Sequence, residues 1–259
     1  MKVTVLGCGS AYGVPYAGGG WGKCDPNNPK NRRTCPSILI EDAETKLLID
    51  MGPDYKEQSI RHNVTKLDAV YFTHPHADHI AGMFHLPIMM SHQNGQNLPM
   101  YADRATRRDI EKVWWYMFDP NINLEYTGTA RPFWREMLPP EKLQIGTLNL
   151  QTFWQQHGNR FKSVGLRIGN FAYSTDVSAF PEESEEYLYG LDTWFVDCNC
   201  VTNTDKSHGY VEQCLAWVEK FKPKKTYLTH LDYTVDYDTV SKMLPDHVEL
   251  AHDGLILDF

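Results

Sequence analysis

One stretch of eight residues, 73 to 80, constrains this chain most: it reads Thr-His-Pro-His-Ala-Asp-His-Ile and holds three histidines and an aspartate. The apolar, β-branched and aromatic residues just before it predict a buried strand. His74 and His76 lie two apart in extended backbone and can therefore reach one metal ion, whereas Asp78 and His79 begin a helix and point to a second position. Imidazole and carboxylate ligands suit zinc, manganese or iron. The alternative is a surface loop without a metal ion, but such a loop has little need of three histidines and an aspartate within six positions.

The motif is similar to the His-x-His-x-Asp-His signature of the metallo-β-lactamase superfamily. That resemblance implies an α/β (α+β) fold, a four-layer αββα sandwich, with two divalent metal ions, manganese or zinc. The ligand set that it implies is His74, His76 and His157 for one ion, Asp78, His79 and His230 for the other, and Asp176 as a bridge between them. The three later ligands each follow an apolar run that predicts a strand. The same resemblance implies that Asp78 and Asp176 are catalytic.

A narrower resemblance comes from the opening Gly-x-Gly-Ser-x-x-Gly-Val-Pro, followed by an Arg-Arg pair and Ser-Ile-Leu-Ile. These motifs are similar to PhnP-type phosphodiesterases, which open phosphoribosyl 1,2-cyclic phosphate in the carbon–phosphorus lyase pathway, and the order of motifs matches over nearly the whole chain. The resemblance implies a general acid, His208, two residues that orient the centre, Asp50 and Asp253, and two that hold a terminal phosphate, Arg32 and Arg33. Each has a simpler alternative: His208 could be a surface histidine, Asp50 could cap a turn, and the two arginines could be solvated loop residues.

The chain departs from this family at its cysteines. The family carries a Cys-x-Cys-x-x-Cys insertion that binds a structural zinc, whereas here only Cys24 and Cys35 stand in the corresponding region. We therefore do not predict that zinc site. Cys24, Cys198 and Cys200 could form another metal site, and packed free thiols are the alternative.

Composition limits the remaining possibilities. No linker divides the 259 residues, so we expect one domain over 1–259. A net charge of -8 argues against binding nucleic acid but allows a small phosphorylated substrate. The absence of a signal segment and of a long apolar run predicts a cytoplasmic protein without membrane spans, whose six cysteines are reduced. The family resemblance further implies a homodimer.

The sequence predicts helices over residues 104–118, 210–221 and 237–244, and apolar residues share one face of the second of them. Asp103 is expected to cap the first of them. The irregular segment 119–140, rich in Pro, Asn and Arg, predicts a loop over the active site.

These features favour an enzyme, a dinuclear metal-dependent phosphodiesterase in which a metal-bridging hydroxide attacks the phosphorus of a small cyclic ribose phosphate. Two hydrolases with the same ligand set are alternatives. The first is a transfer RNA 3′-processing endonuclease, although the chain shows no basic glycine-rich arm. The second is a thioesterase of the glyoxalase II kind, although the chain ends in predicted strands instead of helices. A non-enzymatic scaffold would be expected to lack some ligands, and here all seven positions are filled.

Overall fold

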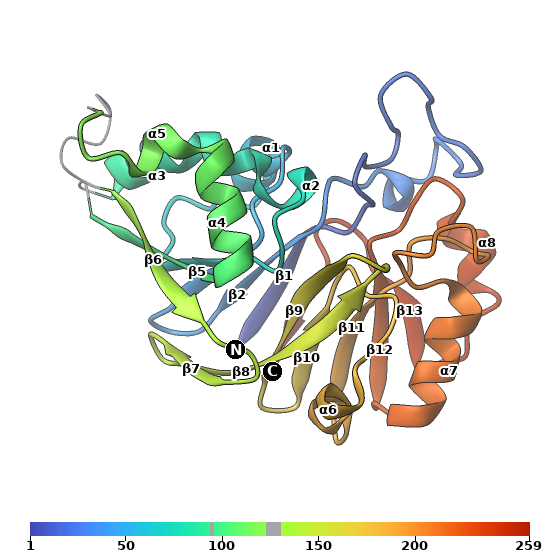
Figure 1. Cartoon of the computed structure of the whole chain (residues 1–259). Helices are drawn as coiled ribbons and strands as arrows, with labels where there is room; N and C mark the ends of the chain where they lie inside the picture. The colour runs from blue at the N-terminus through green and yellow to red at the C-terminus, as the bar shows by residue number, and fades with distance from the viewer. Residues whose placement is uncertain (94–95, 123–130) are drawn as a thin grey trace.

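The computed structural model describes residues 1–93, 96–122 and 131–259. Within these ranges the strands form two seven-stranded sheets that pack face to face, and helices cover the outer face of each sheet (Figure 1). The expected four-layer αββα sandwich is thus confirmed.

The first sheet has the order β14-β1-β2-β3-β4-β5-β6. Its strands are antiparallel from β14 to β3 and parallel from β3 to β6. In chain order they are β1 (Lys2–Gly7), β2 (Ser37–Glu41), β3 (Lys46–Ile49), β4 (Ala69–Tyr71), β5 (Leu98–Asp103), β6 (Pro132–Met137) and β14 (Ile256–Asp258). The helices that accompany this sheet are α1 (Tyr55–Arg61), α2 (Ala77–Ile80), η2 (Ala81–His85), α3 (Leu86–His92), α4 (Arg104–Val113) and α5 (Trp115–Phe118).

The second sheet has the order β13-β12-β11-β10-β9-β8-β7. It is antiparallel from β7 to β10 and parallel from β10 to β13. Its strands are β7 (Lys142–Ile145), β8 (Leu148–His157), β9 (Phe161–Ile168), β10 (Phe171–Ser174), β11 (Thr193–Asp197), β12 (Lys225–Thr229) and β13 (Val248–Leu250). The helices on this side are α6 (Glu182–Glu185), η3 (Glu186–Leu188), α7 (Val211–Phe221) and α8 (Tyr237–Ser241), and η1 (Pro29–Asn31) lies in the long loop after β1.

The core between the sheets is built from alternate residues of facing strands, such as Ile38 and Ile49 of the first sheet and Val164 and Leu166 of the second. All four side chains are buried. At the edge of this core the backbone N–H of Val164 donates to the carbonyl oxygen of Thr73 at 3.0 Å. This bond joins the sheets directly beside the histidine cluster.

The topology explains why the predicted site residues gather at one edge. Parallel strands carry their carboxyl ends on the same side, and ligands in such sheets bind beyond those ends. Asp50 and His74 lie at or just beyond the ends of β3 and β4, and Asp176, Asp197 and His230 occupy the corresponding places after β10, β11 and β12. Each parallel block therefore delivers polar side chains to the same edge.

All three predicted helices are present, although α8 ends at Ser241, before the predicted end at residue 244. α7 matches the predicted 210–221, and Asp103 caps α4 by accepting from the backbone N–H of Ala105 at 2.8 Å. The helix expected over 104–118 is divided at Trp114 into α4 and α5. In the described part of the chain, no helix has the length and apolar character needed to cross a membrane.

The loop predicted over 119–140 was partly wrong. Residues 132–137 form β6, which pairs in parallel with β5 at the edge of the first sheet. Pro132 begins this strand, an edge position that tolerates the missing N–H, and Arg135 and Glu136 break the alternation that would identify a strand. Residues 123–130 of the expected loop lie outside the described residues.

We expect Gly82→Ala to destabilise the fold and to weaken metal binding, because the end of β3 packs tightly against the segment with Asp78 and His79. A Cβ at Gly82 would lie 2.1 Å from the carbonyl oxygen of Gly52. Relieving that clash costs about 1–3 kcal/mol and moves the ligand-bearing turn. The free energy of unfolding and the number of bound metal ions, measured by emission spectroscopy, check this.

Gly190→Ala is the matched control for this experiment. Gly190 has a φ of +71° and open space around its Cβ position, so alanine there costs about 1–2 kcal/mol of backbone strain without touching the site. It should lose stability yet keep its metal ions. Equal metal content in both variants would contradict the prediction.

Candidate metal centre

Three polar residues at the ends of parallel strands share an unusual backbone conformation. Asp50, Asp176 and His230 have φ values of 60°, 53° and 60° and are not glycines. This left-handed conformation costs non-glycine residues of order 1–3 kcal/mol and is kept where the surrounding structure enforces it, often at functional sites. Here it turns the chain sharply at the strand ends and directs the side chains into the space between the sheets.

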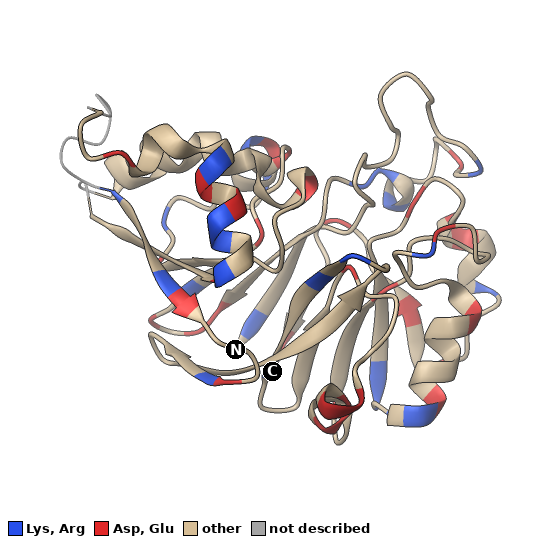
Figure 2. Cartoon of the chain, in the orientation of Figure 1, with Lys and Arg blue, Asp and Glu red and all other residues tan. Residues whose placement is uncertain are grey.

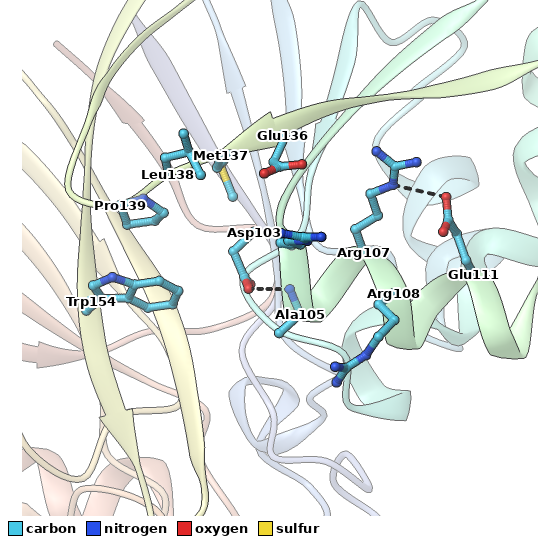
Figure 3. Close-up of a pocket in the computed structure, with 11 residues that line it drawn as sticks. Asp103, Ala105, Arg107, Arg108, Glu111, Glu136, Met137, Leu138, Pro139 and Trp154 are labelled. Carbon is cyan, nitrogen blue, oxygen red and sulfur yellow. Dashed lines mark hydrogen bonds and ion pairs between the residues drawn. The ribbon is translucent and has the colours of Figure 1, made fainter.

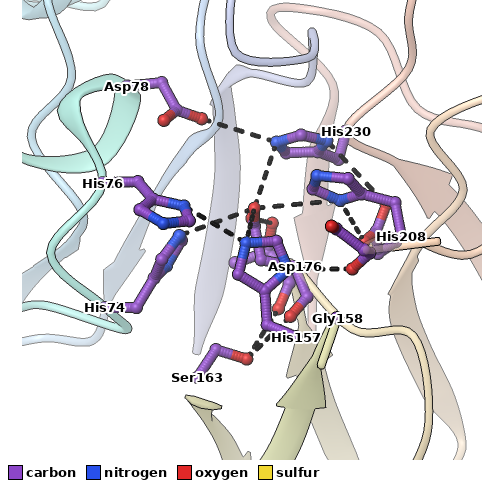
Figure 4. Close-up of polar contacts among 12 residues, drawn as sticks. His74, His76, Asp78, His157, Gly158, Ser163, Asp176, His208 and His230 are labelled. Carbon is purple, nitrogen blue, oxygen red and sulfur yellow. Dashed lines mark hydrogen bonds and ion pairs between the residues drawn. The ribbon is translucent and has the colours of Figure 1, made fainter. Parts of the chain in front are cut away.

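The first donor group consists of His74, His76, His157 and Asp176, whose ligand atoms all lie within 4.8 Å of one another. Asp176 Oδ1 is 3.6 Å from His74 Nε2 and 3.7 Å from His157 Nε2. His157 Nε2 is 3.2 Å from His76 Nδ1. Figure 4 shows these rings converging on the Asp176 carboxylate.

The second donor group consists of Asp78, His79, His230 and the same Asp176. His79 Nε2 is 3.0 Å from Asp78 Oδ2 and 3.1 Å from Asp176 Oδ2. His230 Nε2 is 3.5 Å from both Asp78 Oδ2 and Asp176 Oδ1. Asp176 thus belongs to both groups, and the structure brings together all seven side chains that the sequence singled out as ligands.

Buried ring nitrogens show that these groups fit metal ions. Nε2 of His74 and of His230 are buried without a hydrogen-bond partner among the described residues. Such orphaned polar atoms destabilise a protein unless something binds them. Burial also lowers the pKa of His74 well below its usual range, which keeps its ring neutral, the form that binds metal. Mixed imidazole and carboxylate donors of this kind could hold two divalent ions.

Several of these histidines are oriented through their other ring nitrogen, an arrangement typical of metal-binding imidazoles. His79 Nδ1 lies 2.7 Å from Asp50 Oδ2, and the His157 ring donates from Nδ1 to the carbonyl oxygen of Ser207 at 2.8 Å. Asp50 is itself fixed, because it accepts from the backbone N–H and the hydroxyl of Thr73, both at 2.8 Å. Asp50 therefore connects the two ligand-bearing segments, 73–74 and 78–79.

His208 lies against the donor groups, with its ring stacked on that of His230 at a centroid distance of 4.5 Å. Its Nδ1 is 2.8 Å from Asp197 Oδ2. Burial opposes the charge on His208, but Asp197 and then Asp176 outweigh burial and raise its pKa to about 10. Asp197 is not among the residues that the sequence patterns singled out, although an acidic residue directly after an apolar strand was the available signal.

The structure does not bring Arg33 or Asp253 to the donor groups. The Arg33 guanidinium is buried and donates to the carbonyl oxygens of Asp232 at 3.2 Å and Val235 at 2.8 Å. It thereby fastens the glycine-rich loop to the segment after His230. Asp253 accepts from the backbone N–H of Cys8 at 3.0 Å and of Thr34 at 2.8 Å, and so fixes the same loop from the other side.

Arg32 is exposed, and its guanidinium lies over the Trp21 ring at 5.2 Å. Its place in the loop leaves Arg32 available to a ligand, whereas both terminal nitrogens of the buried Arg33 are bonded within the protein.

The cysteines are free and buried. The Cys24 thiol lies 3.4 Å from the carbonyl oxygen of Val235, next to Arg33. Among the described residues, no cluster of three metal-binding side chains includes a cysteine. Burial raises the pKa of Cys24, which keeps it a thiol instead of a metal-binding thiolate.

We expect Asp50→Asn to weaken metal binding about 10–100-fold, because the amide NH₂ would face a donor and the charge behind His79 would be lost. Competition with a fluorescent chelator measures the affinity. Asp246→Asn, an exposed carboxylate in the loop before β13, is the control and should bind as the unchanged protein does. Unchanged affinity in Asp50→Asn would show that Asp50 only supports the turn.

The chain is similar to known proteins over most of its length. Residues 45–231 match the model of the beta-lactamase superfamily domain. A structure titled as a new diphosphatase from the PhnP family superposes with a TM-score of 0.90 and 32% sequence identity, covering 100% of this chain and 97% of that one.

Curated relatives differ in what they are named for. An octanoyltransferase of Porphyromonas gingivalis is 29% identical over 98% of this chain and 51% of its own length. A ribonuclease Z of Methanopyrus kandleri is 30% identical over 50% of this chain and 43% of its own length. The chain thus spans about half the length of these curated relatives. Because the family model covers most of the chain, the chain belongs to the metallo-β-lactamase superfamily of metal-dependent hydrolases, and within it is similar to the PhnP family.

Proposed function

We propose that the chain is a dinuclear metal-dependent phosphodiesterase that hydrolyses a small cyclic ribose phosphate of the phosphoribosyl 1,2-cyclic phosphate kind. The observation that carries this proposal is the pair of donor groups that share Asp176, with His208 held beside them by Asp197. The likeness to a PhnP-family diphosphatase supports the choice of a phosphate ester.

The roles of the chain's own residues follow from their positions. One ion, manganese or zinc, would be held by His74, His76 and His157, the other by Asp78, His79 and His230, with Asp176 between them. When bound, such ions supply a hydroxide nucleophile at neutral pH and positive charge beside the phosphate oxygens. Because both sheets provide ligands to the same centre, we infer that residues 1–259 form one domain.

His208 is proposed to give the proton that the departing alkoxide needs. Asp197 engages Nδ1, which leaves Nε2 as the nitrogen that donates. Its ring also packs 4.8 Å from that of His157, so the proton source stands beside the first donor group. Asp197 orients this ring without touching the substrate.

The manganese- or zinc-loaded protein should hydrolyse phosphoribosyl 1,2-cyclic phosphate, and His230→Ala should lose more than about a hundredfold in kcat/KM. His92→Ala, an exposed histidine at the end of α3, is the matched control and should keep full activity. Phosphate-ester hydrolysis followed by ³¹P NMR measures both. No turnover with two ions confirmed bound would contradict the proposed substrate.

His208→Gln should lower kcat about 10²–10⁴-fold for an ester with an alkoxide leaving group. The loss should be far smaller for a 4-nitrophenyl ester, because 4-nitrophenolate departs without a proton. Asp197→Asn should show the same contrast to a lesser degree, since the ring stays in place but is less well oriented. Equal losses on both esters would mean that His208 supports the centre instead of donating.

A ribonuclease of the transfer RNA 3′-processing type is the second candidate, favoured by the relative named ribonuclease Z. The net charge of -8 argues against it, because nucleic-acid affinity depends on clustered basic residues. Cleavage of a transfer RNA precursor by the metal-loaded protein, with the cyclic ester left intact, would favour this candidate.

A further inference from the structure

A pocket of about 960 Å³ lies between the N-terminal part of α4, the end of β6 and the outer part of β8 (Figure 3). Its volume falls in the range of sites for small molecules. It is lined by Asp103, Arg104, Ala105, Arg107, Arg108, Glu111, Glu136, Met137, Leu138, Pro139 and Trp154. None of these residues belongs to the donor groups.

The lining has one apolar side and one charged side. The apolar side is formed by Leu138, Pro139 and Trp154. Leu138 is 65% exposed, which leaves its surface free for a ligand. The charged side comes from α4 and Glu136, and Figure 2 shows the basic and acidic positions alternating along α4.

The charged groups nearest the apolar side have few competing partners. Among the described residues no ion pair involves Arg104 or Glu136, and Asp103 is occupied in capping α4. Arg108 pairs with Asp109 at 3.1 Å, but the Arg108 side chain is 65% exposed. Such surface pairs contribute little and yield readily to a multivalent anion.

The pocket is connected to the metal centre through the hairpin of β8 and β9. Lys162 Nζ lies over the Trp154 ring, 5.4 Å from its centroid. The preceding residue, Phe161, is half exposed and packs edge-on against His76 at 4.8 Å. Trp154 itself lies on the strand that ends with His157. Two adjacent residues of β9 thus contact the pocket wall and a proposed metal ligand.

We propose that this pocket binds a nucleotide group, the part of the substrate that does not react. An aromatic base would pack against Trp154, Leu138 and Pro139, as bases do on aromatic and apolar surfaces. Glu136 would accept from ribose hydroxyls, and Arg104 with Arg108 would bind a phosphate. Phosphoribosyl 1,2-cyclic phosphate carries no base, so a nucleotide arm would extend the proposed phosphodiesterase activity to nucleotide esters. That extension rests on the proposed function, whereas binding of a nucleotide to the pocket does not.

Binding of adenosine 5′-monophosphate to the full chain, measured by calorimetry with the metal ions loaded and again after chelation, tests the pocket directly. We expect binding in both states and about tenfold weaker binding by Arg104→Ala and Glu136→Ala. Arg135→Ala is the matched control, because residue 135 lies next to Glu136 on the opposite face of β6 and does not line the pocket. It should bind as the unchanged protein does.

A kinetic experiment tests whether the bound nucleotide belongs to the substrate. The ratio of kcat/KM for the 4-nitrophenyl ester of adenosine 5′-monophosphate to that for bis(4-nitrophenyl) phosphate should fall about tenfold in Arg104→Ala and Glu136→Ala, through KM. In Arg135→Ala the ratio should stay within about twofold of the original.

The outcomes separate the two proposals. The proposal that the pocket binds a nucleotide would be overturned if the nucleotide did not bind after chelation. It would also be overturned if Arg135→Ala lost as much affinity as Arg104→Ala and Glu136→Ala. Binding that follows the prediction with an unchanged kinetic ratio would overturn its role as a substrate arm. Hydrolysis of neither ester would count against the proposed phosphodiesterase while the binding result still decides the pocket.

Discussion

The buried carboxylate of Asp176 is the constraint around which the site is arranged. It lies within 3.7 Å of ring nitrogens from four histidines, two that follow strands of the first sheet and two from the second. A charge at this depth, surrounded by ring nitrogens without partners, is costly unless cations complete the site. The same demand requires that both sheets pack in one fixed relation, which the Val164–Thr73 bond and the shared core provide.

The positions of the ligands depend on strained turns, and the strain has a structural source. Asp50, Asp176 and His230 all adopt positive φ directly after strands that are hydrogen-bonded on both sides. Fixed strands prevent the chain from relaxing, so the turn residue absorbs the strain and its side chain is held in one direction. Ligands placed in this way are set before any ion arrives, which reduces the reorganisation that binding requires.

Much of the metal centre could be predicted from sequence because its ligands form a local pattern. His74, His76, Asp78 and His79 fall within six residues, and each later ligand follows an apolar strand. Asp197 also ends an apolar strand, but this pattern does not reveal its role, which depends on the contact of its carboxylate with the ring of His208. β6 was missed for a related reason: an edge strand with charged residues lacks the alternation of a half-buried one.

Arg33 shows the limit of reading charge from sequence. An Arg-Arg pair in a glycine-rich loop suggests a phosphate site, yet the two side chains separate: Arg32 is exposed and Arg33 is buried. Arg33 donates to backbone carbonyls of the segment 232–235, and Asp253 binds the loop at Thr34. A loop with many glycines has a large conformational entropy to lose, and buried charged hydrogen bonds at both of its ends offset that loss.

In the proposed phosphodiesterase, different parts of the fold would perform catalysis and substrate recognition. Chemistry depends on the ends of parallel strands, where the geometry is rigid and the sequence pattern is local. Recognition of the rest of the proposed substrate would fall to segments around that edge, namely the glycine-rich loop and the α4, β6 and β8 surface. The glycine-rich loop bonds directly to the backbone beside His230, where the N–H of Ser10 donates to the carbonyl oxygen of Leu231 at 3.0 Å. The α4, β6 and β8 surface is linked to the ligands less directly, through Lys162 and Phe161 of β9.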